Sequence, residues 1–190
     1  MNINHMNLIE DIKADIKMRC ESPNNFFGKG CYDHIESVAR HAVELAKQYH
    51  ADIEVCEIAG WLHDIASITD YALYESHHIH GAQMAEAILS TYDYPEVKIE
   101  KVKQCILNHR GSVIRNKMSI EEICVADADA ISHYDNLPAL FYLAYVMRKM
   151  DQNEGVHFVR NKLIRSYDKM SEKSKLYYKD KREQIYNLLG

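Results

Sequence analysis

The sequence has few of the residues that break helices. It contains only seven glycines and three prolines among 190 residues. Both residue types end or interrupt helices, so their scarcity favours long helical segments. The alternation of apolar and polar residues typical of strands is absent, as are low-complexity tracts and repeats of roughly 20–50 residues. These absences argue against a β-rich fold and a repeat protein, and they predict an all-α fold.

The sequence also lacks the marks of several functional classes. No apolar run approaches the roughly 20 residues of a membrane span, and the first residues lack the apolar core of a signal peptide. No block of Lys and Arg stands out, and a net charge of -5 argues against a protein that grips duplex nucleic acid through its phosphates. The five cysteines form no CxxC pair, which suits reduced thiols. We therefore expect a cytoplasmic protein that binds neither a membrane nor duplex nucleic acid.

Length and composition predict one folded domain, residues 1–190. The chain is long enough to bury a core, and its 47% hydrophobic and 27% charged residues are typical of a globular protein. Apolar residues recur at helical spacing through most of it, which predicts a compact multi-helix bundle. Ser119, with Glu122 three positions on, predicts a capping box. The predicted helices cover about 9–18, 33–49, 52–66, 80–92, 95–110 and 119–134, with three more from residue 137. A polar, aromatic loop at 67–76 and a connector at 111–118 are expected between them.

Histidines and aspartates carry the chemical signal. Eleven histidines are many for this length, and several lie on or beside predicted apolar helix faces. His63 and Asp64 are adjacent in the apolar stretch GWLHDIA, where burying such a pair is costly without compensation. His34 begins one predicted helix, His109 ends another, and Asp129 lies inside the apolar helix ICVADADAI. Imidazole and carboxylate together suit Zn²⁺, Mn²⁺, Fe²⁺ or Co²⁺, so the sequence predicts a metal site.

This series of residues resembles the HD-domain superfamily of metal-dependent phosphohydrolases. The matching positions are His34, the adjacent His63 and Asp64, and Asp129 in the segment ADAI, and the resemblance spans about residues 30–135. It implies an HD-domain-like bundle with the helices of residues 137–190 packed on it. It also implies a divalent ion (Mn²⁺, Fe²⁺, Co²⁺, Zn²⁺ or Mg²⁺) held by these four side chains.

Two further histidines match a subset of that family. In HD subfamilies with a two-metal site, one histidine stands four residues before a Gly-Ala that starts a helix, and another ends the next helix. His77 in HHIHGA and His109 in ILNHRGS fill these positions, which implies one or two ions per chain. His78 and His80 lie close enough to His77 to compete for its role.

Other polar residues near these motifs have alternative interpretations. Asp127 and Asp129 are about 200° apart around a helix, so only one should face the metal. The family register favours Asp129, and Asp127 is then expected to accept hydrogen bonds beside the site or to face solvent. His41 is expected to be a packed histidine rather than a ligand. Taken singly, His34 and His109 also fit simple structural roles at helix ends.

The resemblance implies metal-assisted hydrolysis of a small phosphorylated molecule or nucleotide, that is, a phosphomonoester, phosphoanhydride or phosphodiester. In this chemistry the ion lowers the pKa of water and polarises a phosphoryl oxygen. Asp64 is expected to bridge two ions or to orient the water. A substrate phosphate also needs nearby cations. We expect Arg110, next to His109, to supply one, and Lys29 in the loop FGKG to supply another.

Two other functions stay open at this point. Some relatives with a filled two-metal site hold iron and use O₂ as oxygenases, and metal identity and O₂ dependence would separate these from hydrolases. The chain could also be a non-catalytic signalling or scaffold module with a structural metal, but such a module has no need for a costly buried polar cluster. The sequence leaves open the exact substrate, the native metal, the role of residues 137–190 and whether the chain forms a homo-oligomer.

Overall fold

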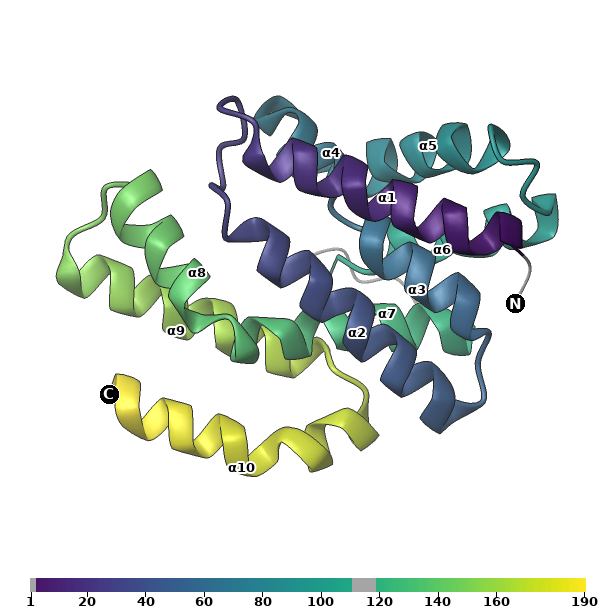
Figure 1. Ribbon diagram of the computed structural model, residues 1–190. Helices are drawn as coiled ribbons and strands as arrows, with labels where there is room; N and C mark the ends of the chain where they lie inside the picture. The colour runs from purple at the N-terminus through teal and green to yellow at the C-terminus, as the bar shows by residue number, and fades with distance from the viewer. Residues whose placement is uncertain (1–2, 111–118) are drawn as a thin grey trace.

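The computed structural model describes residues 3–110 and 119–190, with side chains from residue 7 onward. Its helices, in chain order, are α1 (Ile3–Glu21), α2 (Cys31–Tyr49), α3 (Ile53–Leu62), α4 (Ile65–Thr69), the 3₁₀ helix η1 (Tyr71–Ser76), α5 (His77–Ser90), α6 (Glu96–Asn108), α7 (Ile120–Asp135), α8 (Leu137–Tyr142), the π-helical turn η2 (Leu143–Met147), α9 (Gln152–Lys169) and α10 (Glu172–Leu189). These ranges contain no strand, which confirms the all-α prediction (Figure 1).

Helix α2 is at the centre of the bundle and packs mainly against α3 and α7 (Figure 1). Its apolar face, predicted from helical spacing, is buried and includes Ile35, Val38 and Leu45. Gly60 lets α3 approach α2 closely, because a Cβ atom at this position would lie 2.7 Å from Cα of Ala39. Almost all of α7 is buried as well. The polar side chains of these three helices are therefore held in a closely packed frame.

The chain breaks between α3 and α4, where a continuous helix over residues 52–66 was expected. Helix α3 ends at Leu62, and Asp64 has φ -109° and ψ 10°, outside helical geometry. Asp64 stands at the N-cap of α4, but its carboxylate makes no capping hydrogen bond. The break therefore leaves both carboxylate oxygens available to the interior. The segment expected as a loop at 67–76 is also largely helical, in α4 and η1.

The second half of the chain follows the predicted pattern more closely. The capping box at the start of α7 is confirmed: Ser119 Oγ accepts from the backbone N–H of Glu122 at 3.2 Å, and Glu122 Oε1 accepts from that of Ser119 at 3.1 Å. Three helices follow residue 137, as expected, although η2 extends the first of them. Helix α9 packs on α7, and α10 packs on α9 and α7. The expected connector at 111–118 lies outside the described residues.

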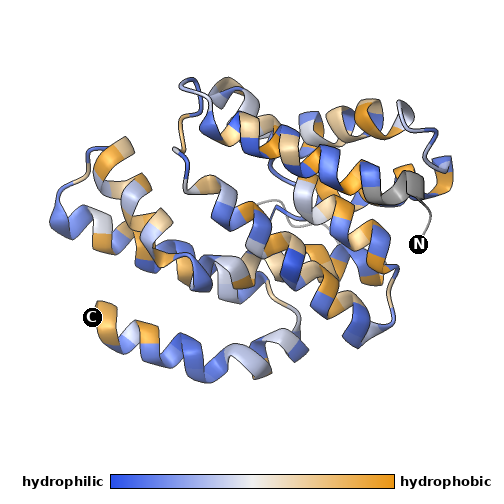
Figure 2. Cartoon of the chain, in the orientation of Figure 1, coloured by the Kyte–Doolittle hydropathy of each residue, from blue (hydrophilic) through white to orange (hydrophobic). Residues whose placement is uncertain are grey.

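Helix α10 forms the outer edge of the bundle. Figure 2 shows it mostly hydrophilic except near its C-terminal end. Its start is held by Asp127 of α7, which accepts from the backbone N–H of Ser171 at 2.9 Å and from Ser174 Oγ at 2.7 Å. Among the described helices, none is both long and apolar enough to cross a lipid bilayer.

Candidate metal centre

Six sequence-predicted residues meet at the middle of the bundle. They come from the first turn of α2, the break between α3 and α4, the start of α5, the end of α6 and the middle of α7. The residues are His34, His63, Asp64, His77, His109 and Asp129. The ligand atoms of His34, His63 and Asp64, and those of Asp64, His77 and His109, form two groups in each of which all atoms lie within 4.8 Å of one another. Asp129 forms a third such group with His34 and His133. Parts of the chain that are up to 95 residues apart therefore contribute to one polar cluster in an apolar interior.

One side of this cluster surrounds Oδ2 of Asp64. The Nε2 atom of His63 lies 3.4 Å from that oxygen, and Nε2 of His34 lies 4.0 Å from it. The same Nε2 atom of His34 lies 3.4 Å from Oδ1 of Asp129. The imidazole of His34 thus links the pair His63 and Asp64 to the carboxylate of Asp129.

The other side of the cluster surrounds Oδ1 of Asp64. The Nε2 atom of His77 lies 3.3 Å from this oxygen and 3.1 Å from Nε2 of His109. These three residues form a second group of potential ligands. The two oxygens of Asp64 therefore face two different sets of histidines.

Hydrogen bonds to Nδ1 determine which nitrogen of each ring faces the centre. For His63, His77 and His109, Nδ1 lies 2.6–2.8 Å from the carbonyl oxygen three residues earlier. A carbonyl oxygen only accepts, so Nδ1 carries the proton and a neutral ring keeps its lone pair on Nε2. His34 is held similarly, because Ser132 Oγ donates to a backbone carbonyl and is left to accept from His34 Nδ1 at 2.9 Å. Such hydrogen bonds are typical of metal-binding histidines.

The lone pairs at the centre fit a divalent cation. The Nε2 atom of His63 is buried and has no hydrogen-bond partner among the described residues. The Nε2 atoms of His77 and His109 face each other at 3.1 Å, which is repulsive unless a proton or a cation lies between them. Two nitrogens bound to one ion at about 2.1 Å, with a bond angle of about 90–110°, lie about 3.0–3.4 Å apart. The observed separation falls in that range.

The electrostatics of the centre keep both carboxylates charged and His109 neutral, whereas burial of His63 is outweighed by the charge of Asp64, which raises the pKa of His63. Burial alone would raise the pKa of Asp64, but the nearby His63 and His77 outweigh it and hold that pKa well below its usual value. Burial likewise opposes ionisation of Asp129, and Lys169 outweighs it, so the pKa of Asp129 is also well below normal. Burial lowers the pKa of His109 well below its ordinary value. Charged carboxylates and a neutral imidazole are the forms that ligate metal ions.

A cavity of about 800 Å³ opens onto the centre. Three cations of α9, Lys162, Arg165 and Lys169, line it, and we call them the α9 cations. Their spacing of three and four residues places them on one face of the helix. Lys169 Nζ donates to Oδ2 of Asp129. Arg110 also lines the cavity.

The two sequence-predicted phosphate contacts occupy different positions. Arg110 lies at the cavity, where it pairs with Oε2 of Glu75 at 2.8 Å. Lys29 is exposed in the loop between α1 and α2, and it is not one of the residues that line the cavity. The structure therefore places the α9 cations, rather than Lys29, beside Arg110 at the cavity wall.

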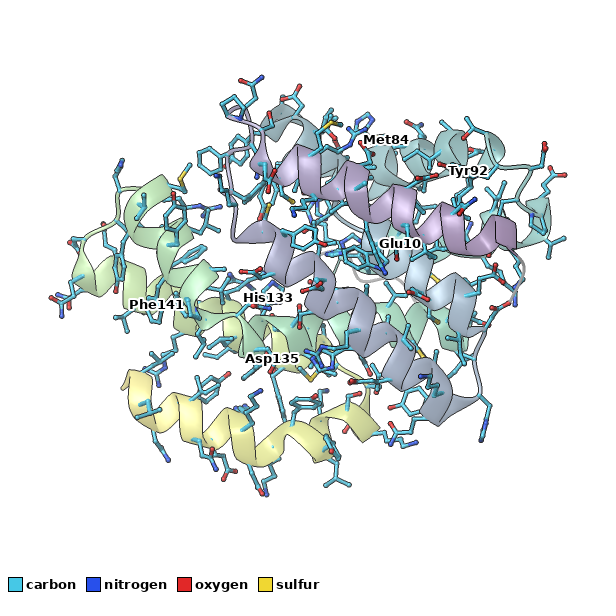
Figure 3. All side chains as sticks on the ribbon, viewed as in Figure 1. Glu10, Met84, Tyr92, His133, Asp135 and Phe141 are labelled. Atoms are coloured by element: carbon cyan, nitrogen blue, oxygen red, sulfur yellow. The ribbon has the colours of Figure 1, made fainter. Side chains whose placement is uncertain are left out.

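Several residues near the motifs lie apart from the two ligand groups around Asp64. His78 is buried and His80 half-buried on α5, and only His77 of this histidine run joins the cluster. His41 is buried, with Nε2 2.6 Å from Oδ2 of Asp135, which is labelled in Figure 3. Asp127, as described above, faces α10 and not the centre.

His133 was not singled out from the sequence. It lies on α7, is labelled in Figure 3, and places Nδ1 3.8 Å from Oδ1 of Asp129. Its ring centroid is 4.8 Å from that of His34. A signal did exist, because residues four apart on a helix share a face. For Lys169, 40 residues beyond Asp129 in the chain, no local pattern indicates the contact.

Comparisons with known proteins agree with this geometry. A sequence model of the HD domain matches residues 31–134. The chain is 35% identical over 107 residues to a protein named Ribonuclease Y from Cutibacterium acnes, and 32% identical over 106 residues to one from Enterococcus faecalis. Each match covers 56% of this chain but only 18% of the relative, so the chain resembles one part of much longer proteins.

Solved structures share the fold over nearly the whole chain. YpgQ from Bacillus subtilis superposes with a TM-score of 0.72 at 17% identity, covering 98% of this chain and 94% of that protein. The Lin1889 protein from Listeria innocua gives a TM-score of 0.68 at 18% identity, covering 100% of this chain and 94% of the other. Another structure of YpgQ was solved in complex with ADP. Since the HD model matches more than half of the residues, the chain belongs to the HD domain family, whose members bind divalent metals and are generally metal-dependent hydrolases.

Proposed function

We propose that this chain is a phosphohydrolase with two metal positions that share Asp64. The observation that carries the proposal is the arrangement around this carboxylate. Oδ2 faces the imidazoles of His34 and His63, while Oδ1 faces that of His77. A carboxylate with each oxygen directed at a separate set of lone pairs is suited to bridge two ions about 3.5–4 Å apart.

The residues divide between the two positions as follows. His34, His63, Asp64 and Asp129 would hold the first ion, and Asp64, His77 and His109 the second. When bound, divalent ions supply Lewis acidity toward a phosphoryl oxygen and lower the pKa of water toward neutrality. The protein orients His63, His77 and His109 through their Nδ1 hydrogen bonds, and burial keeps His109 unprotonated.

The α9 cations are placed to balance the negative charge of a substrate phosphate. Lys169 reaches the centre itself, since it donates to Asp129, and Arg165 and Lys162 continue along the same wall of the cavity. Cations that line a closed site bind phosphate oxygens through charge-assisted hydrogen bonds. Arg110, just after the end of α6, lines the same cavity. Burial lowers the pKa of Lys162, whose half-buried side chain lines the cavity. The exposed Lys29 has no part in this proposal.

The rest of the cavity suits an organic group. Phe27, Tyr74, Leu140, Leu143 and Phe158 line it, so the cavity wall offers apolar as well as cationic surface. A cavity lined by cations and by apolar side chains fits a phosphorylated organic molecule such as a nucleotide. The ADP complex of YpgQ supports this class, because that protein shares the fold.

Phosphate release from a panel of phosphate esters and nucleotides, with Mn²⁺, Co²⁺, Zn²⁺, Fe²⁺ or Mg²⁺, tests the proposal. Wild-type protein should hydrolyse at least one compound, and Asp64→Asn should lose more than about 100-fold in kcat, because one bridging charge is removed. Asp93→Asn is the matched control, since Asp93 is exposed and its positive φ of 49° is one that asparagine adopts readily.

Two outcomes would redirect the proposal. Consumption of O₂ by the iron-loaded protein, without phosphate release, would instead favour a di-iron oxygenase, which the second position formed by His77 and His109 could also serve. Equal activity in Asp64→Asn and Asp93→Asn would show that the centre does not carry the chemistry.

A further inference from the structure

Two cysteines meet at the edge of the cavity. Cys20 lies one residue before the end of α1 and is 1% exposed, while Cys31 is the first residue of α2 and is half-buried. The loop between the two helices brings them close enough for each thiol to affect the ionisation of the other. Cys31 is also one of the residues that line the cavity, so small molecules that enter it can reach this sulfur.

The loop is organised around the pair by a buried amide. Nδ2 of Asn25 lies 3.1 Å from Sγ of Cys31 and 2.9 Å from the backbone oxygen of Cys20. It also lies 3.2 Å from the backbone oxygen of Gly28. One side chain thus ties the end of α1, the loop and the start of α2 together, and it donates toward the Cys31 sulfur.

The two sulfurs have different chemical character. Asn25 donates to the sulfur of Cys31, and Cys31, not Cys20, lines the cavity. The neighbouring Cys20 thiol and the Asn25 amide lower the pKa of Cys31 although burial opposes this, and the Cys31 thiol and burial raise the pKa of Cys20. Cys31 is therefore the sulfur placed to meet an oxidant as a thiolate, with Cys20 as the second thiol. A stabilised, reachable thiolate beside a second thiol is the arrangement that oxidants attack selectively.

We propose that Cys20 and Cys31 form a thiol-oxidation site, which a peroxide that enters the cavity converts to an intrachain disulfide. The Cys31 thiolate attacks one peroxide oxygen, the O–O bond breaks, and the sulfur becomes a sulfenic acid while the other oxygen leaves as water after taking a proton. The Cys20 sulfur then attacks the Cys31 sulfur, loses its proton and displaces the hydroxyl as a second water. Two thiols are oxidised and one hydrogen peroxide is reduced to two waters.

The other three cysteines provide an internal comparison. Cys56, Cys105 and Cys124 are all 0% exposed, and none of them lines the cavity. Cys56 is also hydrogen-bonded to a neighbouring thiol, that of Cys124. Both pairs, Cys20 with Cys31 and Cys56 with Cys124, therefore have neighbouring sulfurs. Access through the cavity distinguishes the pair of Cys20 and Cys31. The proposal predicts oxidation at Cys20 and Cys31 while these three stay reduced.

The site is placed to affect the cavity. Cys31 is one helical turn before His34 on α2, and its side chain is part of the same wall. A disulfide would link this turn to the end of α1 and take the Cys31 sulfur out of its contact with Asn25. Oxidation would thus change the cavity wall beside a proposed metal ligand without altering the ligand itself.

Hydrogen peroxide treatment of the full chain, with a chelator present, tests the proposal by peptide mapping. Trypsin cuts after Arg19, Lys29 and Arg40, so Cys20 and Cys31 leave on separate peptides. We expect the number of free thiols to fall from five to three, a dithiothreitol-reversible link between the two peptides, and unmodified Cys56, Cys105 and Cys124. The test measures thiols and crosslinks and no enzymatic activity, so its result is independent of the proposed hydrolysis.

Two serine variants make the test specific. Cys20→Ser should form no crosslink and should accumulate a sulfenic acid at position 31 that dimedone traps. Cys31→Ser should keep all its remaining thiols. Melting curves of both variants check that they are folded. The proposal is overturned if the native chain keeps five thiols under conditions that oxidise a free thiol, if the crosslink involves any of the other cysteines, or if Cys31→Ser loses thiols as fast as the wild type.

Discussion

The ion pair between Lys169 and Asp129 gives a prediction that joins stability to metal binding. The exposed fractions of the two side chains are only 12% and 9%, and Lys169 Nζ donates to Oδ2 of the carboxylate. Lys169→Ala would leave Asp129 as a buried charge without its strongest partner. Removing one member of a buried pair costs about 3–5 kcal/mol. Two histidines also lie near Oδ1, His34 at 3.4 Å and His133 at 3.8 Å, so we expect the lower end of this range.

A loss of about 3 kcal/mol lowers the melting temperature of a chain of this size by about 6–12 °C. The effect should be present at neutral pH and should shrink as the pH falls through about 4. The reason is that the pKa of Asp129 is depressed in the folded protein, so the pair stabilises fully above the ordinary pKa of the carboxyl group and loses its effect progressively between that value and the lower pKa of the folded protein. A divalent ion at Asp129 would replace the missing positive charge. The metal-induced rise in melting temperature should therefore be larger in the variant than in the wild type.

Scanning calorimetry with and without Mn²⁺ measures both effects. Lys175→Ala is the matched control, because Lys175 pairs with Glu172, whose side chain is 91% exposed, and such a pair contributes about 0–1 kcal/mol. If Lys169→Ala and Lys175→Ala melt together in the absence of metal, the buried pair does not stabilise the fold. If Mn²⁺ raises the melting temperature of Lys169→Ala no more than that of the wild type, Asp129 is not a ligand.

Four further predictions concern stability. A divalent metal at about 100 times its Kd should add about 2.7 kcal/mol, or about 5–11 °C in calorimetry, and a chelator should reverse this. The metal-free chain should lose stability below about pH 6.5. Its folded state holds His109 and His133 at strongly lowered pKa values, so protons bind the unfolded chain more readily, and these two residues outweigh the raised pKa of His63. A melting temperature that does not change with acid pH would contradict this. Asp127→Ala should cost about 2–4 kcal/mol by releasing the start of α10, with metal stoichiometry unchanged, whereas reduced stoichiometry would place Asp127 in the centre. Gly60→Ala should cost about 1–3 kcal/mol in urea unfolding, because its Cβ would lie 2.7 Å from the α2 backbone, and wild-type stability would show that the two helices separate freely.

Much of the fold could be predicted from the sequence because its signals are local. Scarce breakers and apolar residues at helical spacing indicate helices whatever their tertiary contacts, and the Ser119 capping box depends only on residues three apart. The break at His63 and Asp64 could not be predicted in this way. Apolar spacing continues on both sides of it, and the side chains that gather around Asp64 at the break come from α2, α5 and the end of α6, far away in the sequence.

The candidate site shows the same division. Adjacent polar residues in an apolar segment are conspicuous in a sequence, so His63 and Asp64 indicate a site without any knowledge of the fold. The α9 cations are ordinary lysines and arginines of an amphipathic helix, and only the packing of α9 on α7 brings Lys169 to Asp129. The glycine-flanked loop around Lys29 predicted a phosphate contact, but the side chain of Lys29 is exposed in that loop.

Metal content after equilibrium dialysis tests the central claim most directly. Purified chain, its His109→Ala variant and its Asp64→Ala variant are dialysed against Mn²⁺ and analysed for metal and protein. Asp64 lies between the two sets of histidines, and His109 belongs to one set only. We therefore predict two ions per wild-type chain, one in His109→Ala, and at most a weakly held ion in Asp64→Ala. A wild-type chain that binds no ion at saturating metal, or an Asp64→Ala variant that binds as many as the wild type, would contradict a metal centre built around Asp64.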